Sequence, residues 1–244
     1  MRNVISALLS SAVIALAVPS LRAETNTCKP VTSLPFVISN SGIYCLTRDF
    51  SVNMPDGQAI SINASHVVLD LNGHRIGNLS AGPTTQADGI YSTGHINLNI
   101  KNGTIRGFRN AISLIPGDDD SGIVIEDLRL DRNVEAGVLV LGKGAIVRNN
   151  QILETGPGRF GAIVMSGPGG HRVINNDIMT APSGGITFTG NPDIGEDNLA
   201  VNNRISEASS GISYLFGATG KYRDNLTTSV VTPYSGGTDA GNNN

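Results

Sequence analysis

The sequence predicts an all-β protein, a parallel β-helix solenoid of about seven turns with an irregular N-terminal cap. Short aliphatic runs alternate with polar residues and are punctuated by Gly, Asn and Pro, which is typical of strands. Thirty glycines, no tryptophan and few aromatic residues argue against a helical bundle. A phrase with paired asparagines also recurs at near-constant spacing, as VRNNQI from Val147, VINNDI from Val173 and AVNNRI from Ala200.

The N-terminal residues 1–23 predict a secretory signal peptide. Arg2 precedes an apolar stretch from Val4 to Val18, and the small residue Ala23 follows. The stretch is too short for a transmembrane helix with ordinary flanks, and no second apolar run of about 20 residues follows. We therefore expect a secreted or periplasmic protein without a membrane span. An uncleaved amphipathic anchor is the alternative.

From the charge balance we do not expect nucleic acid as a partner. Without Arg2 and Arg22 the 17 basic residues fall to 15, against 20 acidic residues. Phosphate binding needs a basic surface, which this composition does not supply.

Cys28 and Cys45 are the two cysteines of the chain. In an oxidising compartment we expect them to form a disulfide, worth about 3 kcal/mol for a loop of this size. Two unpaired buried thiols are the alternative. Two cysteines are too few for a zinc site.

The chain divides into four predicted segments. Residues 1–23 are the signal peptide, and 24–57 form an N-terminal cap with a first irregular turn. Such a cap covers an open strand edge, which otherwise invites aggregation. Residues 58–231 form the β-helix. Residues 232–244, ending GGTDAGNNN, predict a disordered tail by composition.

A small residue followed by an aliphatic one marks each turn, from Ala59-Ile60 to Gly211-Ile212. Each unit holds three short strands, and alternation places two rows of aliphatic side chains inward. The first row is Ile90, Ile112, Val138, Ile163, Ile186 and Ile212, and the second is Leu71, Ile100, Ile125, Val147 and Val173.

The paired asparagines fall at the corner between the second and third strands of each unit. Asn tolerates left-handed backbone and hydrogen-bonds locally, so it suits a tight corner, and copies in successive turns can bond to one another. We therefore interpret the pair as structural. The corner positions are Asn102, Asp127, Asn149, Asn175, Asn202 and Asp224, each followed by a second corner residue.

Three segments carry a family resemblance: SGIYCLTRDF, AISINASHVVLDLNGHRI and INLNIKNGTIRGFRNAI. They resemble right-handed parallel β-helix repeat proteins of the pectin-lyase-like superfamily, over about Ser33 to Asn225. The resemblance implies a right-handed helix and is specific for architecture. Members include polysaccharide lyases, glycoside hydrolases, uronate epimerases and adhesive scaffolds, so fold alone does not choose an activity.

In enzymes of that superfamily the active groove follows the outward face of the first strand. Here that row is Ser61, Tyr91, Ser113, Leu139, Val164, Thr187 and Ser213, without a carboxylate or a cation. A uronate lyase must neutralise the substrate carboxylate and remove the neighbouring proton.

Charged residues stand at the margins of this row. Under the enzyme hypothesis Arg109 or Arg159 holds a substrate carboxylate and Tyr91 moves a proton. Asp88, Ser113, Glu135 and Thr187 are the expected substrate-binding residues. The competing interpretation is that these charged residues are ordinary solvent-exposed loop residues, without a role in binding or catalysis.

No cofactor is expected to be required, and calcium is the metal ion that an acidic loop would suit. Asp118, Asp119 and Asp120 are adjacent carboxylates, although they lack the spacing of a known calcium loop. A solvated acidic turn is the alternative. His66 and His95 precede equivalent strands and are expected one turn apart, as an exposed pair without a third metal ligand.

The sequence predicts an exported protein directed at a polysaccharide or cell-surface glycan, in a binding or structural role. The alternative is a catalytically active uronate lyase or epimerase. Catalysis, the particular glycan and the oligomeric state stay open at this point.

Overall fold

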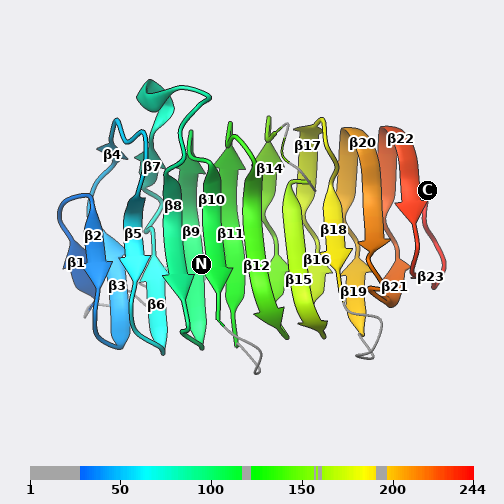
Figure 1. Ribbon diagram of the computed structural model, residues 1–244, viewed down its shortest axis with the longest axis horizontal. Helices are drawn as coiled ribbons and strands as arrows, with labels where there is room; N and C mark the ends of the chain where they lie inside the picture. The colour runs from blue at the N-terminus through cyan, green and yellow to red at the C-terminus, as the bar shows by residue number, and fades with distance from the viewer. Residues whose placement is uncertain (1–27, 117–121, 157, 159–160, 191–196) are drawn as a thin grey trace, which may run out of the picture.

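The computed structural model describes residues 28–116, 122–156, 158, 161–190 and 197–244. Successive turns lie side by side in chain order, from β1–β3 at one end to β22 and β23 at the other (Figure 1). The strand pairings between these turns are parallel. The predicted all-β solenoid of about seven turns is therefore confirmed. The segment 1–23, expected to be a signal peptide, lies outside the described residues.

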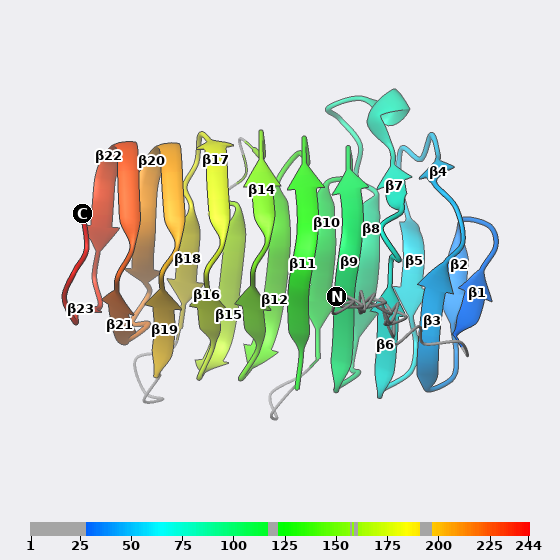
Figure 2. The ribbon, with the colours of Figure 1, turned by 180° about the vertical axis from the view of Figure 1, so that it is seen from behind.

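Each turn contributes a strand to three faces in succession; Figure 2 shows the opposite side of the molecule from Figure 1. The first face consists of β2 (Phe36–Ile38), β5 (Gln58–Ile62), β8 (Asp88–Thr93), β10 (Asn110–Ile115), β12 (Ala136–Lys143), β15 (Ile163–Gly169), β18 (Ile186–Thr189) and the second halves of β20 (Arg204–Leu215) and β22 (Leu226–Ser235). The second face consists of β1 (Lys29–Val31), β3 (Gly42–Leu46), β6 (Val67–Asp70), the first halves of β9 (Leu98–Arg106) and β11 (Val124–Asp131), β13 (Ile146–Arg148), β16 (Arg172–Ile174), β19 (Asn198–Val201), β21 (Gly220–Arg223) and β23 (Thr238–Asp239).

The third face completes each turn. It consists of β4 (Phe50–Ser51), β7 (Arg75–Gly77), the second halves of β9 and β11, β14 (Gln151–Leu153), β17 (Asp177–Ala181) and the first halves of β20 and β22. A single turn of 3₁₀ helix, η1 (Leu79–Ala81), projects from the loop between the third and first faces.

Aliphatic side chains fill the narrow interior, because alternate residues of each strand point inward. The first predicted row is confirmed: its six members pair in register and are at most 1% exposed. The second row contains one error. Ile100 pairs with Leu69 rather than Leu71. Leu69 and Leu71 are both fully buried. The alternation of apolar residues therefore fits either position, and the sequence pattern alone did not show which of the two belongs to the row.

Where the small residue at or near the start of a first-face strand is glycine, packing against the third face requires it. A Cβ at Gly137 would lie 2.9 Å from Cγ2 of Ile152, and one at Gly185 would lie 2.8 Å from Cδ1 of Ile205. The interior is too narrow here for a larger side chain. The small residue of the pair that marks the repeat is therefore explained by the close approach of the first and third faces.

The asparagine corner is built as predicted. All six first-position residues have positive φ, between 54° and 59°. The second-position residues Asn150, Asn176, Asn203 and Asn225 are buried and bond to one another along the helix axis. Each donates its Nδ2 to the Oδ1 of the next, at 3.0 Å for the first three links. We call this row the inner asparagine ladder.

An outer ladder runs beside it on the surface. Asn175 donates its Nδ2 to Oδ1 of Asn149 at 2.8 Å, and Asn202 donates to Asn175 at 3.1 Å. The two asparagines of each pair thus serve two separate columns. Their recurrence is confirmed as architectural.

The tail is folded, contrary to our expectation of disorder for 232–244. β22 continues to Ser235, and β23 follows at Thr238–Asp239. Asn225 donates to Oδ1 of Asn243 at 3.1 Å, so the inner asparagine ladder extends into the final three asparagines. Asn242 has the positive φ of a corner residue. Composition indicated disorder, whereas the NN signature at this position indicated one more corner.

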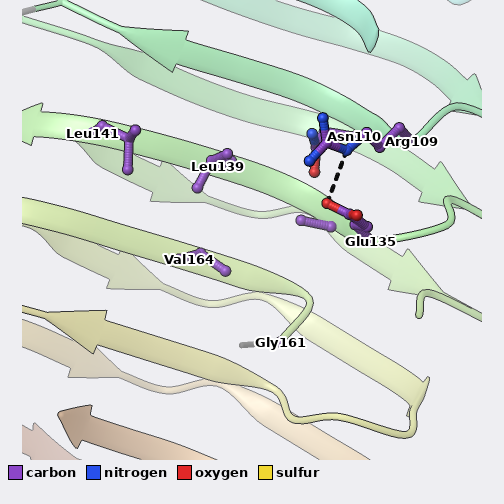
Figure 3. A pocket seen from close by; sticks show the side chains of 8 residues that line it. Arg109, Asn110, Glu135, Leu139, Leu141, Gly161 and Val164 are labelled. Carbon is purple, nitrogen blue, oxygen red and sulfur yellow. Dashed lines mark hydrogen bonds and ion pairs between the residues drawn. The ribbon is translucent and has the colours of Figure 1, made fainter. Parts of the chain in front are cut away.

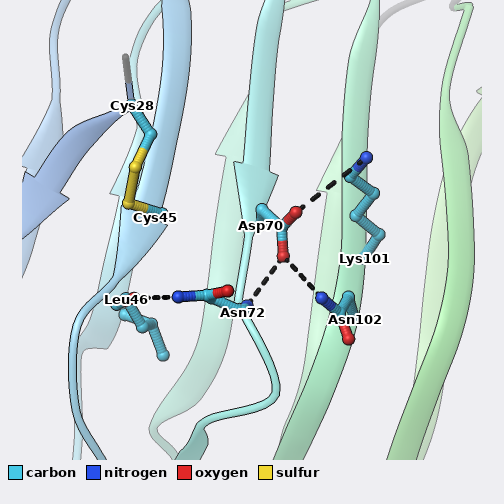
Figure 4. The surroundings of a disulfide bond; sticks show 7 residues. All are labelled: Cys28, Cys45, Leu46, Asp70, Asn72, Lys101 and Asn102. Carbon is cyan, nitrogen blue, oxygen red and sulfur yellow. Dashed lines mark hydrogen bonds and ion pairs between the residues drawn. A yellow bond between two sulfur atoms is a disulfide. The ribbon is translucent and has the colours of Figure 1, made fainter. Parts of the chain in front are cut away.

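The cap segment holds β1 to β4, and a disulfide joins Cys28 to Cys45, with a Cα–Cα distance of 5.7 Å (Figure 4). The bond links the residue just before β1 to β3. Nearby, Asp70 accepts hydrogen bonds from the backbone N–H of Asn72 and from Nδ2 of Asn102. Asp70 therefore organises the asparagine corner of the early turns.

Candidate functional site

The outward row of the first face lies in register across seven turns, as the sequence predicted. Two of its members, expected to bind substrate, are buried: Ser113 is 3% exposed and Thr187 is 1% exposed. Val164 and Ser213 are also buried, each 5% exposed. The middle of this face therefore does not offer a continuous open row of polar side chains.

A hollow of about 280 Å³ opens at the margin of the first face. We call it the Arg109 hollow. It is lined by Arg109, Asn110, Glu135, Ala136, Leu139, Leu141, Gly161 and Val164. In Figure 3 the aliphatic side chains lie along the strands and the polar ones gather where the strands begin.

An ion pair stands at the polar end of this hollow. Nε of Arg109 donates to Oε2 of Glu135 at 2.9 Å, and both side chains are about 40% exposed (Figure 3). The two residues occupy equivalent places in successive turns, since the backbone N–H of Glu135 donates to the carbonyl of Arg109. The guanidinium retains unused N–H donors and the carboxylate retains unused acceptor positions.

Asp88 lies behind this pair. Its Oδ1 accepts hydrogen bonds from the backbone N–H and the Nδ2 of Asn110, at 3.3 and 2.9 Å. Burial raises the pKa of the Asp88 carboxyl above its ordinary value, against these bonds and the attraction of Arg109. The raised pKa makes Asp88 a carboxyl that holds its proton more firmly than an exposed aspartate.

The predicted site residues are thus only partly brought together. Arg109, Glu135 and Asp88 form one cluster. Tyr91 lies on β8, in register with Ser113 on the next turn, and is two rungs from Leu139. Two rungs correspond to about 10 Å, so Tyr91 lies outside the hollow. Arg159, the third predicted catalytic residue, lies outside the described residues.

Sequence reasoning missed Asn110 and the apolar lining as parts of one site. Asn110 stands one turn on from Asp88, at the equivalent position of the repeat, so aligning the turns would have paired them. Leu139 and Val164 were assigned to the outward row, as residues that suit a protein or glycan contact or a covering loop, but not to a site shared with Arg109. Leu141, two residues further along β12, gave no separate signal.

The predicted metal residues Asp118, Asp119 and Asp120 lie outside the described residues. Within the part of the chain that is described, no three His, Cys, Asp or Glu side chains gather as a metal site would require. His66 and His95 are not paired across one turn. His66 contacts Asn97 instead, with 3.2 Å between its Nδ1 and the Asn97 Nδ2. Among the described residues, no helix has the length and apolar character needed to cross a membrane.

His171 is a buried histidine in the turn between β15 and β16. It is 1% exposed, and its Nδ1 accepts the backbone N–H of Ala145 at 3.3 Å. Burial lowers the pKa of His171 to about 4, although the backbone carbonyls of Ser166 and Gly142 favour the proton. The folded protein therefore keeps this imidazole neutral at pH values where an unfolded chain would protonate it.

We expect His171 to make folding stability fall with acid between pH 6.5 and about 4. In that window only the unfolded chain takes the proton, at a cost to the fold of about 3 kcal/mol. A His171→Asn variant retains an oxygen that can accept the Ala145 N–H and should lose less stability on acidification. Urea denaturation at pH 7 and pH 4.5 measures this, with His95→Asn as the control. Parallel pH dependence in all three proteins would contradict the assignment.

The topology and the register define the class of this protein, a parallel β-helix with three faces per turn. The family model described as right handed beta helix region matches residues 88–243, more than half of the chain. The chain therefore belongs to the right-handed β-helix family, which confirms the resemblance stated from the sequence.

A solved structure has a similar fold, the endopolygalacturonase I from Stereum purpureum complexed with two galacturonate. The TM-score is 0.51 at 14% sequence identity, and the match covers 84% of this chain and 69% of that chain. At this identity the likeness concerns the fold. A search of curated proteins gives no match.

Proposed function

We propose that this protein is an exported glycan-binding β-helix and that the Arg109 hollow is its sugar site. The observation that carries the proposal is the lining of the hollow. Leu139, Leu141 and Val164 form an apolar wall, and Arg109 and Glu135 stand at its polar end. Pockets for small molecules combine mostly apolar lining with a few placed polar groups.

A sugar ring matches this arrangement chemically. One side of a pyranose presents C–H groups, which pack against aliphatic side chains, and its hydroxyls donate and accept at the ring edge. The Arg109–Glu135 pair offers both donors and acceptors to such hydroxyls. A hollow of about 280 Å³ suits one small unit of a glycan rather than a long segment.

Export is supported by two features. The segment 1–23 has the pattern of a signal peptide, and the Cys28–Cys45 disulfide is the kind of bond that persists in oxidising compartments. A secreted or periplasmic location would bring the protein to polysaccharides and cell-surface glycans.

A second candidate function is catalysis on a uronate polymer, as a lyase or epimerase. It is favoured by Asp88, because burial raises the pKa of this carboxyl close to the Arg109–Glu135 pair, and shifted carboxyl groups are typical of acid–base sites. The similar solved structure carries galacturonate, which makes galacturonate polymers the first to test. Binding is our preferred function because Arg109 is engaged by Glu135 and Tyr91 lies outside the hollow.

The test is a binding screen of the full chain against polygalacturonate, alginate, xylan and cellulose oligomers by isothermal titration calorimetry. We expect Arg109→Gln to weaken binding about tenfold, because it removes a charged hydrogen-bonding group from the site. Arg148→Gln is the matched control. Arg148 also bonds to a glutamate, Glu126, but on the second face, and its side chain is 49% exposed against 40% for Arg109.

The same samples separate binding from catalysis. New unsaturated ends would absorb in the ultraviolet, and epimerisation would appear by NMR. Turnover that Asp88→Asn abolishes while binding persists would favour the enzyme. Absence of binding to every glycan, or equal loss in Arg109→Gln and Arg148→Gln, would contradict the proposed sugar site.

A further inference from the structure

A second hollow, of about 320 Å³, lies at the corner between the third and first faces. We call it the Leu79 hollow. It is formed by turns of four successive coils, and its lining residues are Leu79, Gly82, Pro83, Gly107, Arg132, Asn133, Val134, Glu154 and Gly156.

One wall of the Leu79 hollow is the projecting loop that contains η1, and both ends of this loop are anchored. At one end Asn78, fully buried, accepts the backbone N–H of Met54 at 2.7 Å and donates Nδ2 to its carbonyl at 2.9 Å. At the other end the Thr85 hydroxyl, also fully buried, donates to the same carbonyl at 2.7 Å. The loop therefore holds Leu79, 37% exposed, in a defined place.

The floor of the hollow lies directly against this loop. Gly107 has φ of +74°, and a Cβ there would lie 2.6 Å from the backbone nitrogen of Leu79. Only glycine meets both the backbone conformation and the close approach. The backbone of Gly107 thus packs directly against the backbone of Leu79, which fixes the floor of the hollow relative to its wall.

The chemistry of the Leu79 hollow repeats that of the Arg109 hollow. An ion pair between successive turns, Nε of Arg132 to Oε2 of Glu154 at 2.8 Å, stands beside apolar groups. Both members of the pair are more than half exposed, so their remaining donors and acceptors face solvent. The apolar groups are Leu79, Pro83 and Val134.

The two hollows are joined by one short stretch of chain. Arg132, Asn133 and Val134 line the Leu79 hollow, and the next residues, Glu135 and Ala136, line the Arg109 hollow. Three residues of backbone span at most about 11 Å, which limits the distance from Arg132 to Glu135. Neighbouring units of one oligosaccharide fit such a separation.

We propose that the two hollows are adjacent subsites of one glycan site, which crosses the corner between the third and first faces, transverse to the helix axis. This inference rests on the proposed glycan-binding function and adds the direction and length of the ligand. A glycan lying along the whole first face would instead meet Ser113, Thr187 and Ser213, whose side chains are buried. The corner carries the two polar-rimmed openings.

The test compares oligomers of one to five units with wild type, Leu79→Ser and Met179→Ser, by calorimetry. Galacturonate oligomers and cello-oligomers of these lengths are the probes. Met179 is the matched control, because it is an apolar residue of the third face with the same 37% exposure as Leu79. We expect Leu79→Ser to bind oligomers of two or more units about fivefold more weakly, since part of the apolar contact is lost.

Binding of the single sugar unit should stay unchanged in Leu79→Ser, whereas Arg109→Gln should weaken every length. Full affinity of Leu79→Ser for all lengths, with Arg109→Gln impaired, would overturn the corner-crossing site and leave the proposed function standing. Equal loss in Met179→Ser would also overturn it. No binding of any oligomer by wild type would overturn both.

Discussion

Replacing Ile163 with aspartate is expected to lower the free energy of unfolding by about 5 kcal/mol or more at pH 7. Ile163 is fully buried, and it pairs with Val138 on one side and Ile186 on the other. A carboxylate there has only aliphatic neighbours in its row. It must stay charged without partners or take a proton far above its usual pKa, and either outcome costs stability.

The measurement is urea denaturation followed by circular dichroism. Ser166→Asp on the same strand is the control, because Ser166 points to the opposite side and is half-buried. If Ile163→Asp does not fold, Ile163→Val supplies the graded case, with an expected loss of about 1 kcal/mol. Equal effects of Ile163→Asp and Ser166→Asp would mean that the strand faces the other way.

Replacing Asn176 with alanine is expected to cost about 4 kcal/mol. Asn176 is 1% exposed in the middle of the inner asparagine ladder. Its Oδ1 accepts both the backbone N–H and the Nδ2 of Asn150, and its own Nδ2 donates to the carbonyl of Val147. Alanine leaves several of these groups buried without partners, each at about 1–3 kcal/mol.

Asn175→Gly is the matched control for this variant. Asn175 is the exposed neighbour, with φ of +56°, and glycine adopts that backbone without strain. Its loss removes only outer-ladder bonds on the surface, so a change below about 1 kcal/mol is expected. Comparable destabilisation of the two variants in thermal unfolding would contradict the separate functions of the two ladders.

The sequence predicted the architecture well because each turn repeats the same constraints. Three features recur in the turns: inward aliphatic residues, small residues near the start of the first-face strands, and asparagines at one corner. Each of them independently indicates the same register of the repeat. The two errors arise where that redundancy is missing. Leu69 and Leu71 both fit the inward pattern, and the final asparagines lie in a segment whose composition is that of a flexible tail.

The candidate site was harder to predict, because it depends on turns whose lengths differ from coil to coil. Asp88, Arg109 and Glu135 were found as charges at the margin of the first face. Their hydrogen bonds depend on which turns become neighbours. The Leu79 hollow had no sequence signal, since it forms from an η1 loop that departs from the repeat.

The spacing of the inner asparagine ladder has a consequence for how this chain tolerates change in length. Successive members are 26, 27, 22 and 18 residues apart, yet the side chains still bond in line. Extra residues must therefore be absorbed in turns outside the three faces. A segment grafted into such a turn would leave the amide column intact, whereas one residue inserted within a strand would reverse which side chains face the interior. Surface loops of this β-helix can therefore be exchanged without altering the hydrogen bonds of the inner asparagine ladder.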